Sequence, residues 1–241
     1  MSTIDWYGNV SLVVFFAGCN LRCLYCQNSG LIPLGSGRTV PLSVLRDRLE
    51  AEKMILDAVV FTGGEPLLQP DALLEAAKLV KSYGFKVMLD TNGSIKPDVE
   101  RMLTSGLFDR IALDVKAPLK QGPMGKVTGR PELGASIAES VEYCLELSKE
   151  LGLEMEVRTT IAPGVSDDPE FIREIAVAIL GRSHAYYLQQ FDNVGEVLDK
   201  NLKLEHPPSR EEMISLANIA LSTGLRNVYI KTRQNGLEKV G

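Results

Sequence analysis

Three cysteines stand close together near the start of the chain. Cys19, Cys23 and Cys26 follow an apolar run at the spacing C-x3-C-x2-C. A loop of this length can bring three thiolates to one face of a cubic iron-sulfur cluster, and the fourth iron is then free to bind a substrate or cofactor. The fourth cysteine, Cys144, lies far along the chain in a helical pattern, which favours a packed core thiol. The spacing predicts a redox-active cluster with one open iron.

Other interpretations of the cysteines are open. A structural zinc ion needs four ligands, and His184 or His206 could supply the fourth. A thioredoxin-type redox pair at Cys23 and Cys26 would leave Cys19 without a role. The three thiols could also be a chance cluster of buried side chains.

Two glycines and a carboxylate follow the second apolar run. The segment reads Thr62-Gly63-Gly64-Glu65-Pro66. Paired glycines let a ligand approach the backbone, and Glu65 could accept hydrogen bonds from an ammonium group. Taken alone, the segment is equally typical of a strand-to-helix turn.

Charged residues follow or interrupt the next apolar runs. Asp90 opens the segment DTNG, and Asp114 and Lys116 belong to DVK. An acidic pair suits a hard cation, with Lys116 as a counter-charge, although both aspartates could instead cap the following helices. Arg158 lies inside a fifth apolar run, where its burial requires an anionic partner.

The apolar runs themselves alternate with helical patterns. Short runs rich in β-branched and aromatic residues predict strands, and apolar residues at helical spacing lie between them. Ser209 and Glu212 form a capping-box pattern that opens the last helix. Repeated βα units predict a parallel sheet, open or curled toward a barrel, with the chemistry at the C-terminal ends of the strands. The expected strands cover residues 10–16, 58–62, 85–90, 110–115, 155–161 and 185–191, with a last short one near 228–231.

Length and composition limit the class of protein. The chain has 241 residues, a formal net charge of −5 and 45% hydrophobic residues, which predicts one α/β domain over residues 1–241. An acidic chain argues against nucleic-acid binding. The longest apolar run is too short to cross a bilayer. Closely spaced cysteines do not resemble a secreted disulfide framework, so we expect a cytoplasmic protein without membrane or nucleic-acid partners.

The cysteine motif, with Tyr25 before the third cysteine, resembles the defining motif of the radical S-adenosylmethionine (SAM) superfamily. Further matches follow in the expected order over nearly the whole chain. The resemblance implies a partial (β/α)6 barrel, and an oxidoreductase whose 4Fe-4S cluster on the three cysteines reductively cleaves SAM to a 5′-deoxyadenosyl radical. Such an open iron would make the protein sensitive to air. The implied cofactor-binding residues are Tyr25, Gly63, Gly64, Glu65, Asp90, Asn92, Lys116, Arg158 and Gln190.

A narrower resemblance points to the activating enzymes of glycyl-radical enzymes. In that group the residues matching Asp90, Thr91 and Asp114 help to build a monovalent-cation site. The opening segment, residues 2–8, and the terminal segment, residues 228–233, are similar to the activating protein of anaerobic ribonucleoside-triphosphate reductase. The resemblance implies a protein substrate that receives a glycyl radical, and an electron donor such as flavodoxin or ferredoxin. At Gln190 several relatives carry a histidine, so its contact with ribose or adenine is a suggestion.

Other functions share many of these residues. A radical SAM enzyme acting on a small molecule, such as a deazapurine precursor, would keep every cofactor residue. A non-enzymatic iron-sulfur or zinc protein would bind metal without cleaving SAM. The glycine-rich, basic segment 120–130 is expected to be a loop that either becomes ordered on a partner or lies idle on the surface.

Overall fold

The computed structural model describes all residues from Met1 to Gly241. It contains one eight-stranded sheet in the order β1-β2-β3-β4-β5-β6-β7-β8. Strands β1 to β7 are parallel, and β8 is antiparallel to β7. The strands are β1 (Ser11–Phe16), β2 (Ala58–Gly63), β3 (Lys86–Thr91), β4 (Arg110–Asp114), β5 (Glu154–Ile161), β6 (Ala185–Gln190), β7 (Val228–Thr232) and β8 (Gly236–Lys239).

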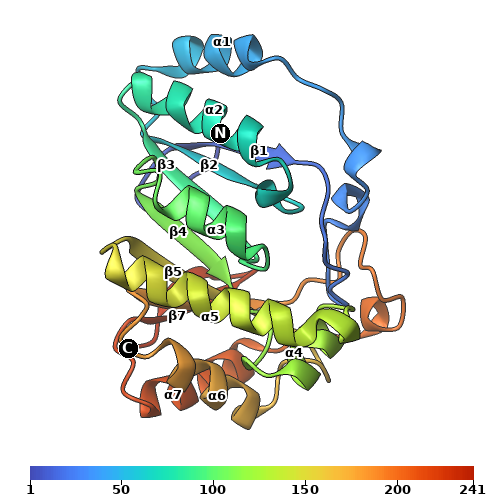
Figure 1. Ribbon diagram of the computed structural model, residues 1–241. Helices are drawn as coiled ribbons and strands as arrows, with labels where there is room; N and C mark the ends of the chain where they lie inside the picture. Colours follow the sequence, from blue (N-terminus) through green and yellow to red (C-terminus); the bar gives the residue numbers. More distant parts are fainter.

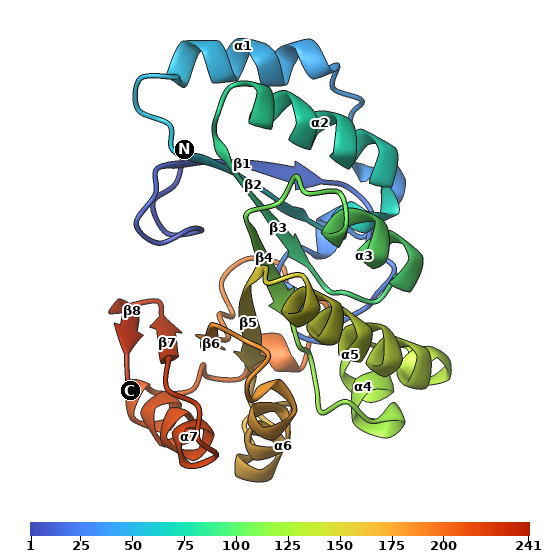
Figure 2. The same ribbon diagram turned by 60° about the vertical axis from the view of Figure 1, so that its left-hand side comes forward.

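The helices cover the outer face of the curled sheet (Figures 1 and 2). They are α1 (Leu42–Glu52), α2 (Pro70–Ser82), α3 (Lys96–Leu103), α4 (Gln121–Val127), α5 (Gly134–Glu150), α6 (Pro169–Ile179) and α7 (Arg210–Ser222). Strands β1 and β8 do not pair, so the sheet is curled without being closed. This confirms the expected α/β fold with parallel strands. No helix is both long and apolar enough to cross a membrane.

Two elements differ from the expectation. Strand β8 was not predicted, because the short sequence GLEK has little apolar character. Helix α4 occupies most of the segment expected to be a loop, and its Met124, Gly125 and Val127 are buried. Glycine and proline lower helix propensity, but packing against α5 offsets that cost. The segment 120–130 is therefore neither idle nor unstructured.

The two faces of the sheet have different cores. Most buried apolar side chains lie in one large cluster that includes Phe61, Leu89 and Ile111. Residues one position away point to the inner face, where Trp6 joins Ala58, Val60, Met88 and Ala112 in a second, small cluster. Farther along the same strands the inner positions become polar, and there the sheet presents its functional groups.

Candidate active site at the cysteine loop

The cysteine loop follows β1 and is braced on both sides by segments distant in sequence. Arg22 N–H donates to the Thr128 carbonyl at 2.8 Å, and Leu24 N–H donates to that of Val127 at 3.3 Å. On the other side, Asp199 N–H donates to the Leu24 carbonyl at 3.0 Å. The loop conformation is therefore set by the C-terminal end of α4 and by the segment after β6.

Gly63 and Gly64 let the loop after β2 pass directly against the cysteine loop. A Cβ at Gly64 would lie 2.0 Å from the Gly18 carbonyl oxygen, and one at Gly63, whose φ is +126°, would lie 2.3 Å from that of Phe16. Glu65 N–H donates to the same Gly18 oxygen at 2.7 Å. The glycine pair thus allows two backbone segments to approach each other closely, in addition to any approach by a ligand.

A cavity of about 400 Å³ opens at the C-terminal ends of the strands. It brings together nearly all the predicted site residues, from β1, β2, β3, β4 and β5. Those on its wall are Cys19, Cys23, Tyr25, Cys26, Gly63, Gly64, Asp90, Thr91, Asn92, Asp114, Lys116 and Arg158.

Glu65 and Gln190 lie away from this wall. Glu65 is fully buried, and its oxygens accept from Thr91 Oγ1 at 2.7 Å, Asn92 N–H at 2.8 Å and Leu67 N–H at 3.0 Å. Burial raises the pKa of Glu65 to about 7, although the three donors oppose that shift. Its carboxylate holds the loop after β3, and a contact with an ammonium group stays a prediction.

Gln190 requires a correction. Its side chain donates to the Pro208 carbonyl at 2.7 Å and accepts from Arg233 N–H at 2.8 Å. Its neighbour Gln189 lines the cavity instead, because successive strand residues point to opposite faces.

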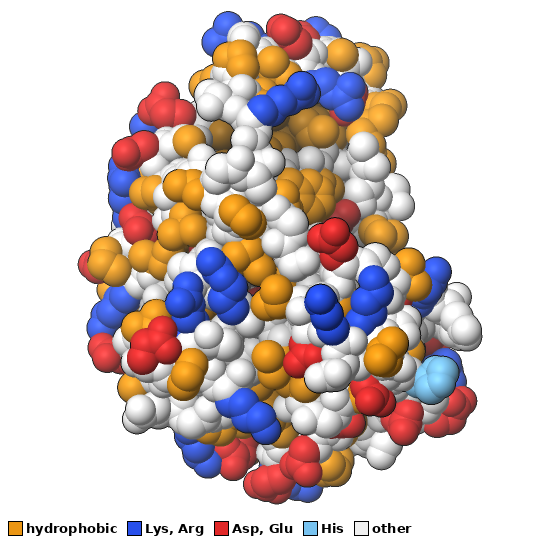
Figure 3. Space-filling model, turned by 90° about the vertical axis from the view of Figure 1, so that its right-hand side faces the viewer, with side chains coloured by type: hydrophobic (Ala, Val, Ile, Leu, Met, Phe, Trp, Pro, Cys, Tyr) orange, Lys and Arg blue, Asp and Glu red, His pale blue; other side chains and the backbone are white.

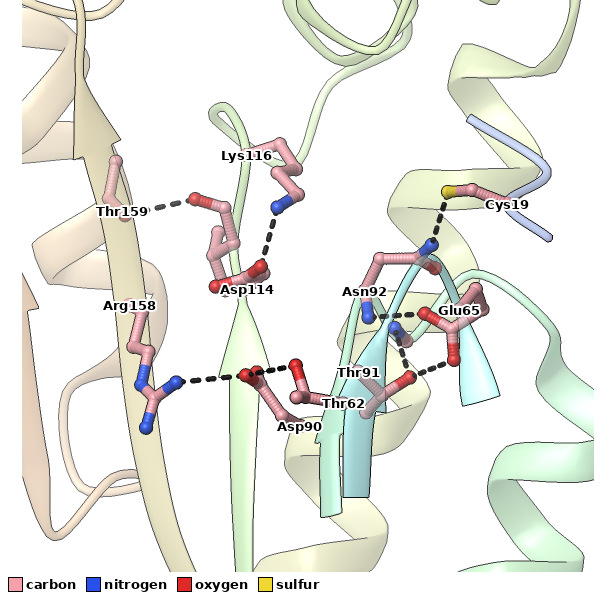
Figure 4. A network of polar contacts seen from close by, with 12 residues as sticks. Cys19, Thr62, Glu65, Asp90, Thr91, Asn92, Asp114, Lys116, Arg158 and Thr159 are labelled. Atoms are coloured by element: carbon pink, nitrogen blue, oxygen red, sulfur yellow. Dashed lines mark hydrogen bonds and ion pairs between the residues drawn. The ribbon is translucent and has the colours of Figure 1, made fainter. Parts of the chain in front are cut away.

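The charged groups of the cavity are paired (Figure 4). Asp90 Oδ2 accepts from Thr62 Oγ1 at 2.9 Å and from Arg158 Nη1 at 3.0 Å. Asp114 Oδ2 lies 2.6 Å from Lys116 Nζ. Neither aspartate caps a helix. The N-cap residues of α3 and α4 are Ile95 and Lys120, and their side chains make no capping hydrogen bond.

These pairings shift the pKa values of the buried charges. Burial raises the pKa of Asp90, and Arg158 opposes the rise. Burial disfavours a charged Lys116, but Asp114 outweighs it and holds the Lys116 pKa well above its ordinary value. The hydroxyl of Thr91 donates to Glu65, while Asp90, Thr91 and Asp114 all line the same cavity, and the monovalent-cation site stays a prediction.

The cysteines fit a four-iron cluster with one open iron. All three thiols line one cavity, and no three Cys, His, Asp or Glu side chains lie close enough to hold a single metal ion. Burial raises the pKa of Cys23 to about 12, so the thiolate requires a cationic partner such as iron. The buried hydroxyl of Tyr25 has no hydrogen-bond partner, which leaves a polar group available to a ligand.

Ten lining residues were not among the predicted site residues: Asp5, Phe15, Leu21, Gln27, Asn28, Ile32, Thr62, Thr160, Gln189 and Lys231. Thr62 and Gln189 lie at the ends of β2 and β6, and Lys231 lies on β7. Their positions at strand ends were a signal that could have found them. Asp5 reaches the cavity from the N-terminal segment, for which the sequence offered no such signal. On the face of the molecule shown in Figure 3, Lys and Arg side chains are interspersed with Asp and Glu.

Cys144 and the two histidines lie outside the site. Cys144 is fully buried in the main core on α5. His184 Nδ1 accepts from Met155 N–H at 3.0 Å, and His206 is exposed. None of the three lines the cysteine cavity.

Comparison with known proteins connects this site to a family. Residues 13–175 match the radical SAM superfamily. A Methanocaldococcus jannaschii protein named "putative glycyl-radical enzyme activating enzyme" is 33% identical over 96% of this chain and 93% of its own. The pyruvate formate-lyase-activating enzyme of Clostridium pasteurianum is 32% identical over 73% of this chain and 71% of its own.

Solved structures agree on the fold. A radical SAM methyltransferase from Sphaerobacter thermophilus superposes with a TM-score of 0.72 at 17% identity, covering 94% of this chain and 67% of that one. Streptococcus suis SuiB bound to its precursor peptide also gives 0.72, at 16% identity, covering 94% of this chain and 49% of that one. At these identities the likeness concerns the fold alone.

Proposed function

The chain belongs to the radical SAM superfamily, among the glycyl-radical enzyme activating enzymes, and we propose that its substrate is an anaerobic ribonucleoside-triphosphate reductase. Enzymes of this family use a 4Fe-4S cluster and SAM. When bound, these groups would supply one-electron cleavage of SAM and the hydrogen-atom abstraction that leaves a glycyl radical on the protein substrate.

In the proposal, the residues of the cavity hold these groups by complementary charge. Cys19, Cys23 and Cys26 hold three irons. Lys116 and Arg158 offer positive charge to the SAM carboxylate, and Asp90 offers negative charge to its ammonium group. The side chains of Lys116, Arg158 and Asp90 are 16%, 11% and 18% exposed, and this partial burial strengthens their electrostatic contacts.

Support for a reductase partner comes from the two segments that resemble reductase-activating proteins. The N-terminal segment carries Asp5 and the C-terminal one carries Lys231, and both side chains line the cavity. Lys231 Nζ donates to the Ile4 carbonyl at 3.2 Å. The segments that carry the resemblance therefore meet at the wall of the cavity to which the proposal assigns the radical chemistry, and this observation carries the proposal.

Pyruvate formate-lyase is the second candidate partner. The named relatives from Clostridium pasteurianum and Escherichia coli, at 32% and 25% identity, are activating enzymes for that lyase. Either partner would need an electron donor, for which we propose flavodoxin or ferredoxin. The free state of all four cysteines favours a reducing, cytoplasmic setting.

The test is anaerobic. Protein reconstituted with iron and sulfide is given dithionite and SAM, together with the reductase, with pyruvate formate-lyase, or with neither. Liberated 5′-deoxyadenosine is quantified, and electron paramagnetic resonance measures the glycyl radical in the partner. Each partner is matched by a variant whose target glycine is alanine.

We expect a glycyl radical in the reductase and none in its alanine variant. A radical formed faster or only in the lyase would overturn the partner assignment while leaving the family intact. Cleavage of SAM that yields no radical in either protein would favour a small-molecule substrate instead.

A further inference from the structure

The carboxamide of Asn92 is held in one orientation by four contacts. Its Nδ2 donates to Asn20 Oδ1 at 3.2 Å and lies 4.0 Å from Cys19 Sγ, in a hydrogen-bonding direction. Its Oδ1 accepts from the Ser94 amide at 2.9 Å and from Ser94 Oγ at 2.5 Å. A carboxamide has two N–H hydrogens and two acceptor positions, so every position is used.

The neighbouring side chains exclude the flipped amide. Asn20 Nδ2 donates to Ser94 Oγ at 2.8 Å, which turns Asn20 Oδ1 toward Asn92 as an acceptor. Flipping Asn92 would set oxygen against that acceptor and against the sulfur, and would set its NH2 group against the Ser94 N–H. One N–H of Asn92 is therefore aimed at Cys19.

The backbone of Asn92 is anchored independently of this ring. Its N–H donates to Glu65 Oε2 at 2.8 Å, and Thr91 Oγ1 donates to Glu65 Oε1 at 2.7 Å. Glu65 in turn accepts from the Leu67 amide at 3.0 Å. The loop after β3 is thus fixed to the loop after β2, and its amide reaches across to the loop after β1 (Figure 4).

The three cysteine ligands differ in the hydrogen bonds that their sulfur atoms accept. Cys19 Sγ faces the side-chain N–H of Asn92. The Sγ atoms of Cys23 and Cys26 accept no side-chain hydrogen bond. Hydrogen bonds to the sulfurs of an iron-sulfur cluster stabilise its more negative, reduced form and raise its reduction potential.

We propose that Asn92 is a positioning residue that raises the reduction potential of the cluster through an N–H···S bond to Cys19, and that Asn20 and Ser94 orient its amide for this task. The role differs from contact with SAM, because it acts through a cluster ligand. It rests on the cluster that the family uses and is independent of the partner protein.

The test measures the midpoint potential of the reconstituted cluster by anaerobic redox titration without SAM. In Asn92→Leu, which removes the donor at similar volume, the reduced-to-oxidised ratio at a fixed potential should fall about tenfold, equivalent to a shift of 59 mV to more negative potential for one electron. Ser94→Ala should shift the potential in the same direction by less, since the amide keeps its N–H but loses its orientation. Asn227→Leu, an exposed asparagine whose side chain donates to the His184 carbonyl, is the matched control.

An unchanged potential in fully loaded Asn92→Leu would overturn the proposal, as would an equal shift in Asn227→Leu. If Asn92→Leu does not load iron fully, Ser94→Ala decides by the same criterion. Because no partner protein is present, failure of the reductase assignment would leave this result unaffected.

Discussion

At the scale of the residue, burial determines what each thiol can do. Cys23 is 9% exposed, and Cys144 is fully buried; burial raises the pKa of both to about 12. Neither is a thiolate at neutral pH without a cation. The difference lies in their neighbours, since Cys23 shares a cavity with two more thiols and Cys144 packs among apolar side chains.

Single alanine substitutions should separate ligands from the core thiol. Cys19→Ala, Cys23→Ala and Cys26→Ala should each lose the cluster, because two thiolates do not hold it. Cys144→Ala should keep full iron and sulfide content and lose only stability, by about 1–2 kcal/mol for a small cavity. Iron analysis and absorption spectra of reconstituted proteins measure the first effect, and urea unfolding measures the second. Full iron content in any of the first three variants would contradict the ligand assignment.

At the scale of the element, α4 and the turn after it act as a support for the cysteine loop. Besides the backbone bonds from Arg22 and Leu24, Arg130 Nε donates to the Asn20 carbonyl at 2.9 Å. Gly129, with φ +62°, passes so close that an added Cβ would lie 2.4 Å from the Arg22 carbonyl oxygen. The segment therefore positions cluster ligands that lie about a hundred residues earlier in the sequence.

Two glycines in this segment provide a matched pair of substitutions. Gly129→Ala should displace the cysteine loop and reduce iron loading, because its Cβ has no room beside Arg22 and its backbone is left-handed. Gly122→Ala, in α4 with nothing within 4 Å of the added Cβ, should load normally and gain up to about 1 kcal/mol. Iron content after reconstitution and urea unfolding check both variants. Equal loading of the two would show that the support is dispensable.

At the scale of the whole molecule, a chain of ion pairs connects the N-terminal ends of β4 and β5 to the active site. It runs from Glu154 through Arg110, Glu156 and Arg158 to Asp90. Register creates it, because β4 and β5 pair Arg110 with Glu154 and Asp114 with Arg158. Arg158 Nη2 also donates to the Asp5 carbonyl at 3.3 Å, which secures the N-terminal segment.

Removing one buried charge from this chain should cost more than removing an exposed one. The Glu156 side chain is 7% exposed and contacts two arginines, whereas that of Glu154 is 45% exposed and contacts one of the same two. Glu156→Gln should lower the free energy of unfolding by about 3 kcal/mol, and Glu154→Gln by less than about 1 kcal/mol. Urea unfolding of the cluster-free proteins measures both. Similar losses in the two variants would mean that the buried Glu156 contributes no more to stability than the exposed Glu154.

The sequence by itself determined the local features. Apolar runs and helical spacing predicted seven strands and every long helix, since both periodicities follow from backbone geometry. The cysteine spacing predicted the cluster loop. The expectation that functional residues follow each strand identified most of the residues that line the cavity. Local patterns do not show which of two neighbouring residues at a strand end faces the cavity. Gln189 and Gln190 are the example.

The tertiary structure decided every feature that depends on distant segments meeting. Helix α4 forms despite its glycines because α5 and the cysteine loop pack on it. Glu65 accepts hydrogen bonds from the loop after β3, a structural role that its motif did not predict. The orientation of Asn92, the approach of Asp5 and the pairing of Asp90 with Arg158 all arise from sheet register and curl. These are long-range contacts, and a chain's local propensities do not specify them because the free energy that selects them comes from packing and buried charge pairing.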